Sequence, residues 1–101
     1  MELKPGSRWK SAACNTEVVV VRPPKKAVVL ECGGHPMTPA TGTPSNAALS
    51  PDFSAGTLIG KRYFDEEASL EVLVAKGGVG SLSVNGRSLR VKEAKALPSS
   101  D

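Results

Sequence analysis

The sequence predicts an all-β fold, a small antiparallel barrel or sandwich of five to six strands with a long irregular central loop. Three observations support it: short segments rich in β-branched residues, turn-forming residues between them, and no convincing helical periodicity. The best helical alternative, "RVKEAKAL", is short and ends at Pro98. A twisted meander of this kind covers its apolar face by curling into a barrel or by packing as two layers.

The length of 101 residues predicts one domain, 1–101, with a modest core. Within it we expect an N-terminal hairpin lobe (7–35), a Pro/Ser/Thr/Ala-rich loop (36–56), a C-terminal β-meander (57–93) and a frayed tail (94–101). Only 4% of the residues are aromatic, so the core should consist mainly of Val, Leu and Ala.

Two apolar segments in the N-terminal half, "EVVVVR" (17–22) and "AVVLEC" (27–32), predict a β-hairpin around "PPKK". Proline cannot donate a ladder hydrogen bond, so both prolines belong in the connection. If the strands pair about its centre, Glu17 faces Cys32 and Cys14 faces His35.

The C-terminal half predicts a meander. Strands are expected at 57–64 and 70–76, joined by the turn "DEEA", and two hairpin turns should follow. The first is "KGGVGS". The second is Asn85-Gly86, a strong signal for a type I′ turn that places Val84 opposite Arg87.

The stretch "ECGGHPM" (31–37) holds the only histidine of the chain and one of its two cysteines. In "CGGH" two glycines separate Cys32 and His35, a spacing that lets both donor atoms converge on one ion. The hairpin register adds Cys14, and Glu17 is the candidate fourth ligand. The sequence therefore predicts one zinc or iron ion at Cys14, Cys32, His35 and Glu17, with Cu(I) at the cysteines and Met37 as a weaker option.

Other interpretations of the same residues remain open. Free cysteine is often a small buried apolar residue, in which case the two glycines only form a tight turn. A disulfide or redox pair is disfavoured by the hairpin, because Cys14 and Cys32 are then offset by three positions and point to opposite faces. A Cys14–His35 catalytic dyad lacks a recognisable orienting group.

Composition favours an accessory role. No apolar run is long enough to span a bilayer and no secretory signal is recognised, so we expect a cytoplasmic protein without a membrane partner. No catalytic residues are recognised, which favours a non-enzymatic role without deciding the question. We therefore expect an accessory or protein-interaction β domain that binds another protein or a larger enzyme, in an oligomeric state that the sequence leaves open.

Two alternative functions stay open. One is a small metalloenzyme or electron carrier whose ion keeps an open position. The other is a nucleic-acid-binding β-barrel with Lys61, Arg62, Tyr63 and Arg90 on a strand face. The net charge of +3 is small for a nucleic-acid binder, so we do not expect nucleic acid as the partner.

Overall fold

The computed structural model describes residues 2–42 and 47–92. Within these residues the chain forms two antiparallel sheets and a single 3-10 turn, η1 (Pro51–Phe53). The larger sheet has the strand order β10 (Arg90–Lys92), β6 (Arg62–Asp65), β7 (Leu70–Lys76), β2 (Glu17–Arg22), β1 (Arg8–Lys10) and β5 (Thr38–Pro39). The smaller sheet has the order β4 (His35–Pro36), β3 (Leu30–Cys32), β8 (Leu82–Val84) and β9 (Arg87–Ser88). The all-β prediction is confirmed, and the architecture is an open sandwich rather than a closed barrel.

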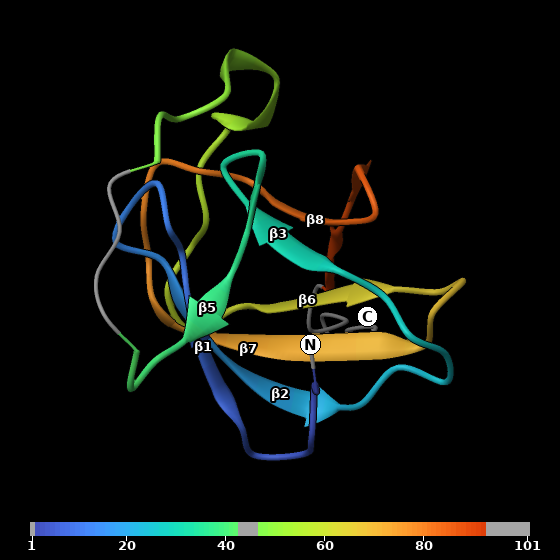
Figure 1. Ribbon diagram of the computed structural model, residues 1–101. Coiled ribbons are helices and arrows are strands. Elements are labelled where there is room, and N and C mark those ends of the chain that lie inside the picture. Colours follow the sequence, from blue (N-terminus) through green and yellow to red (C-terminus); the bar gives the residue numbers. More distant parts are fainter. Residues whose placement is uncertain (1, 43–46, 93–101) are drawn as a thin grey trace, which may run out of the picture.

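The core lies between the two sheets. In Figure 1 the strands β2, β7 and β6 form one layer, and β3 and β8 lie above it. Alternate residues of β2 and β7 point into this space, and β3 and β8 contribute the opposite wall. The most completely buried side chains are Leu30, Leu70, Val18, Val20, Val72, Val74, Val84, Thr16, Cys32 and Ser83.

The predicted hairpin between 17–22 and 27–32 is wrong. The strand β2 pairs with β1 on one side and with β7 on the other, whereas β3 pairs with β4 and β8. The segment with Pro23 and Pro24 therefore carries the chain from one sheet to the other. The physical reason is burial, because the seven-residue β7 can cover the valines of β2 along their length and the three-residue β3 cannot.

The C-terminal meander is correct in two of its turns. The strands β6 and β7 form the expected hairpin, but β6 covers Arg62–Asp65 instead of the expected 57–64. Asn85 and Gly86 have φ values of 50° and 82° in a turn that pairs Val84 with Arg87. The hairpin expected at "KGGVGS" is wrong, because β7 and β8 belong to different sheets. There Gly78 forms a bridge with Thr57 while the chain crosses between the layers.

The described residues of the central segment 36–56 are attached to the sandwich, and Thr38–Pro39 among them form β5. Met37 is buried in the core, and the backbone N–H of Ser50 donates to the carbonyl of Gly33 at 2.9 Å. The N–H of Ser81 in turn donates to the carbonyl of Phe53 at 2.8 Å. Residues 43–46 of this loop, residue 93 of the meander and the tail 94–101 lie outside the described residues.

A charged pair joins the two sheets. The Arg87 guanidinium of β9 donates from Nε and an Nη atom to the two carboxylate oxygens of Asp65 on β6, at 2.9 and 2.7 Å. The hydrogen bonds from Arg87 lower the pKa of Asp65 despite its burial, and the N–H of Ala68 assists. Bidentate pairing of this kind fixes orientation as well as distance.

The described part of the chain contains no helix with the length and apolar character needed to cross a bilayer.

Candidate functional site

The two cysteines, one on a loop of the larger sheet and one on a strand of the smaller sheet, meet at one end of the sandwich. Cys14 lies on the loop 11–16 between β1 and β2, and Cys32 is the last residue of β3. Their sulfur atoms are 3.8 Å apart, and both are free thiols. Cys32 is completely buried, whereas Cys14 is partly exposed. The expectation that they point to opposite faces is wrong, because it followed from a hairpin that does not form.

The loop 11–16 is organised by a serine side chain. The Ser11 hydroxyl oxygen accepts hydrogen bonds from the backbone N–H groups of Ala13 and Cys14, at 3.0 and 3.1 Å. The N–H of Ser11 donates to the carbonyl of Thr16 at 2.8 Å and closes the loop at its base. Serine commonly replaces a backbone acceptor in this way in turns. The result is a compact loop that holds the Cys14 sulfur over the end of the core.

Polar groups surround the Cys14 sulfur. It lies 3.4 Å from the Ser11 hydroxyl and 3.2 Å from the Thr16 hydroxyl, and the N–H of Gly80 donates to it at 3.4 Å. Partial burial acts to raise the pKa of the Cys14 thiol, but the hydrogen bonds from Ser11, Thr16 and Gly80 outweigh it and lower this pKa to about 7. In the thiolate both hydroxyls act as donors. The arrangement therefore favours a reactive thiolate at neutral pH.

Cys32 has the opposite environment. Its burial raises the pKa of the thiol to about 11, opposed in part by Ser11 and Thr16, while the charge of a Cys14 thiolate adds to the rise. Cys32 consequently stays protonated when Cys14 ionises, and its S–H can donate to the Cys14 sulfur across the 3.8 Å contact. The pair thus combines one nucleophilic sulfur with one neutral sulfur beside it.

Glycines in the crossing segment 77–81 make this packing possible. A Cβ on Gly78 would lie 2.5 Å from the Thr16 hydroxyl oxygen, and a Cβ on Gly80 would lie 3.0 Å from the Cα of Gly33 and 3.1 Å from the Cys14 sulfur. Any side chain there would have to displace the loop or the β3–β4 turn. The glycines of "KGGVGS" thus serve close approach to Cys14 rather than a hairpin turn.

A solvent-exposed hollow of about 760 Å³ adjoins Cys14. Its wall is formed by the loop 11–16, the neighbouring ends of β1, β2 and β7, and Ala47. Lys10, Glu17 and Lys76 are the charged side chains in this wall. A molecule that entered the hollow would reach Cys14 but not the fully buried Cys32.

The predicted ligand His35 does not face Cys14. It stands opposite Cys32 across the Gly33-Gly34 turn, whose φ values of 66° and 87° agree with the expected tight turn. The Nε2 atom of His35 is hydrogen-bonded to the carbonyl of Ala48. The expected Cys14–His35 pairing is wrong because β2 and β3 lie in different sheets.

The predicted ligand Glu17 lies on β2, where it pairs with Lys10 and Lys76 instead of Cys32. Its carboxylate forms ion pairs with Arg8 at 3.4 Å and Lys76 at 3.9 Å. Within residues 2–42 and 47–92 no three His, Cys, Asp or Glu side chains are grouped as a metal site would require. Of the four predicted ligands, Cys14 and Cys32 lie in contact with each other. Metal binding itself stays a prediction.

Three residues that shape the site were missed from the sequence: Ser11, Thr16 and Gly80. The pattern "SAACNT" carried a usable signal, since Ser before small residues and Asn is typical of a tight turn. That signal could have placed a hydroxyl near Cys14. Nothing local could have placed Gly80, which is 66 residues further along the chain.

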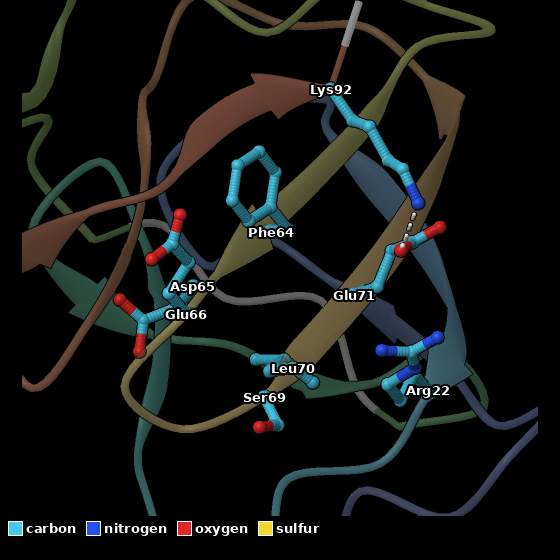
Figure 2. Close-up of a pocket in the computed structure, with 8 residues that line it drawn as sticks. All are labelled: Arg22, Phe64, Asp65, Glu66, Ser69, Leu70, Glu71 and Lys92. Atoms are coloured by element: carbon cyan, nitrogen blue, oxygen red, sulfur yellow. Dashed lines mark hydrogen bonds and ion pairs between the residues drawn. The ribbon is translucent and has the colours of Figure 1, made fainter.

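A second hollow, of about 410 Å³, lies between β6, β7 and β10 (Figure 2). Figure 2 shows the carboxylates of Asp65 and Glu66 on one side, and Lys92 reaching toward Glu71 on the other. Asp65 is already held by Arg87, and the Glu71–Lys92 pair measures 3.1 Å. Three of its charged side chains, Asp65, Glu71 and Lys92, thus already form ion pairs, and we interpret the hollow as structural.

Tyr63, the aromatic residue considered for nucleic-acid binding, is not available for base stacking. Tyr63 is buried, and its hydroxyl oxygen accepts a hydrogen bond from the N–H of Leu58 at 3.0 Å. Arg62 forms an ion pair with Glu71 at 3.3 Å. An exposed aromatic platform is what this mode of binding requires, and Tyr63 does not provide one.

Comparison with protein-family models, curated protein sequences and solved structures finds no match to this chain. Functional inference therefore rests on the geometry of the residues described above.

Proposed function

We propose that this protein is a small accessory β-sandwich module whose working group is a redox-active dithiol, Cys14 and Cys32. The observation that carries the proposal is the 3.8 Å contact between two free sulfurs in opposite environments. Cys14 is accessible and surrounded by donors, and Cys32 is buried beside it. Attack by an accessible thiolate followed by resolution by a neighbouring thiol is the usual course of thiol–disulfide exchange.

The chemistry has two balanced steps. The Cys14 thiolate attacks one sulfur of a disulfide, a new S–S bond forms, and the other half leaves as a thiolate. Cys32 then loses its proton and attacks the Cys14 sulfur, which forms the Cys14–Cys32 disulfide and releases the second half as a thiolate. Two electrons pass to the external disulfide, and the two released thiolates take up the two protons lost by the protein. The reverse sequence oxidises an external dithiol.

Formation of the mixed disulfide also prepares Cys32 for the second step. A Cys14 thiolate is one of the causes that raise the pKa of Cys32. Once Cys14 is bonded to another sulfur it has no charge, and this cause disappears. The intramolecular bond would then connect the loop 11–16 of the larger sheet to β3 of the smaller sheet. Oxidation would thereby change the link between two layers, a change that a partner protein could recognise.

The test treats the protein and two serine variants with oxidised glutathione and follows the products by intact-mass spectrometry. The unmodified chain should form an intramolecular disulfide. Cys32→Ser should stop at a mixed disulfide on Cys14, and Cys14→Ser should react slowly because Cys32 is buried. Circular dichroism checks that both variants are folded. Equal reaction of the two variants, or no intramolecular disulfide in the unmodified chain, would contradict the proposal.

A second candidate, a metal-stabilised accessory domain, is supported by the same distance. Two thiolates bound to one tetrahedral zinc at ~2.3 Å have sulfurs roughly 3.8 Å apart, and the sulfurs here are 3.8 Å apart. The remaining ligands would come from a partner or from a rearrangement of His35 or Glu17. Elemental analysis of the purified protein tests this candidate, with thiols titrated before and after a chelator. A stoichiometric metal that shields both thiols would favour it over the redox dithiol.

A further inference from the structure

The charges beside Cys14 are arranged in a row across three strands. Lys10 of β1 is paired in register with Glu17 of β2, and Glu17 is paired with Lys76 of β7. All three side chains contribute to the wall of the hollow that opens onto Cys14. The row therefore sets the electrostatic potential at the entrance to the thiol.

The net charge of this row is positive. The single carboxylate of Glu17 is only 17% exposed and is already compensated by Arg8 at 3.4 Å and Lys76 at 3.9 Å. Lys10 donates to the carbonyl of Gly42 at 2.7 Å, which positions its ammonium group without neutralising it. The Lys76 side chain is 69% exposed. Two lysines therefore line the hollow against one partly buried carboxylate.

The dimensions of the hollow indicate a small molecule. Its volume of about 760 Å³ lies within the ~300–1,000 Å³ range of small-molecule sites. Ala12, Ala13 and Ala47 leave the wall unobstructed around Cys14. The side chain of Asn15 adds a neutral polar group for a peptide amide or carboxylate.

We infer that the disulfide exchanged at Cys14 is small and anionic, a peptide disulfide with free carboxylates of the glutathione type. This inference rests on the proposed dithiol function and names its substrate class. Lys10 and Lys76 attract the carboxylates and orient the S–S bond toward Cys14. The Cys14 thiolate displaces one half as an anionic thiolate, which takes up a proton in solvent. The other half stays on Cys14 until Cys32 displaces it with loss of its own proton.

The test compares three disulfides on the full chain: oxidised glutathione, which carries net negative charge, cystamine, which is cationic, and neutral 2-hydroxyethyl disulfide. Rates of Cys14 modification are measured by quenched mass spectrometry and divided by the rates of the same chain in denaturant, which removes differences in intrinsic reactivity. Oxidised glutathione should have a normalised rate at least about fivefold above that of cystamine at low salt, with the ratio falling toward one as salt screens the charges.

The charge variant is Lys10→Gln/Lys76→Gln, which should remove most of the preference for oxidised glutathione over cystamine. Its matched control is Lys25→Gln/Lys26→Gln, which removes two positive charges just beyond the other end of β2. That control should keep the preference for oxidised glutathione over cystamine. Both variants retain Cys14, Cys32 and the hydroxyls that surround them.

The outcomes separate this inference from the proposed function. If all three disulfides yield the Cys14–Cys32 bond but cystamine is as fast as oxidised glutathione, the substrate class is wrong and the dithiol function stands. Equal loss of the preference in both lysine variants would mean that net charge, not the hollow, is responsible, and also overturns the inference. If none yields the intramolecular bond, the dithiol function fails and the inference fails with it.

Discussion

Thr16→Val tests whether hydroxyl groups hold Cys14 in its ionised form. Valine has nearly the same shape as threonine, so the substitution removes one donor at 3.2 Å from the Cys14 sulfur and leaves the packing in place. Thr16 is fully buried, so water cannot readily replace the lost hydroxyl. The pKa of Cys14, about 7 in the unmodified chain, should therefore rise.

The size of the rise follows from the strength of the bond. A hydrogen bond to a charged group contributes about 1.5–3 kcal/mol, and one pKa unit corresponds to about 1.4 kcal/mol. Because sulfur is a weak acceptor, we take the lower limit and expect a pKa of about 8 in the variant. At pH 7 the thiolate fraction falls from about one half to about one tenth, yet each thiolate becomes about threefold more nucleophilic. The alkylation rate should then fall about twofold at pH 7 and rise about threefold above pH 9.

The assay is the pH dependence of iodoacetamide alkylation in a Cys32→Ala background, so that only one thiol reacts. The control is Thr38→Val, because the buried Thr38 hydroxyl has no hydrogen-bond partner among the described residues. That control should leave the midpoint of the pH profile unchanged. The expectation is refuted if Thr16→Val, while folded, keeps the same midpoint as the Cys32→Ala parent, or if the rate curves of the two proteins never cross.

Three further predictions concern stability, each measured by urea unfolding. Oxidation of the two cysteines, which are 18 positions apart in the chain, should stabilise the fold by about 3 kcal/mol through chain entropy; an oxidised form no more stable than the reduced one contradicts this. Asp65→Asn should destabilise by about 2 kcal/mol at neutral pH, because charged hydrogen bonds from Arg87 are lost. Since the pKa of Asp65 is lowered in the folded state, its contribution is complete above the unfolded pKa and is lost in acid, so the difference should narrow as the pH falls below the unfolded pKa of about 4. A difference that stays constant would contradict this linkage. Gly78→Ala places a Cβ 2.5 Å from the Thr16 hydroxyl oxygen and should cost about 1–3 kcal/mol; an unchanged midpoint would show that the crossing segment can shift freely.

Local signals explain which parts of the fold were predictable. The Asn85-Gly86 turn and the β6–β7 hairpin depend on residues that are close in the chain, and both formed as expected. The pairing of β2 was not predictable in the same way. Its valines fit any apolar strand, and the choice of β7 over β3 depends on which partner buries more surface in the finished sandwich.

The candidate site, like the fold, was predictable from the sequence only in part. The sequence by itself determined the all-β fold and the tight turn at Gly33-Gly34, and it singled out the two cysteines. Only the tertiary structure decided that Cys14 meets Cys32 rather than His35, that the Gly80 N–H donates to the Cys14 sulfur, and that Lys76 flanks it. The physical reason is that these contacts join segments far apart in the chain, and their distances are set by how two sheets pack across a shared core.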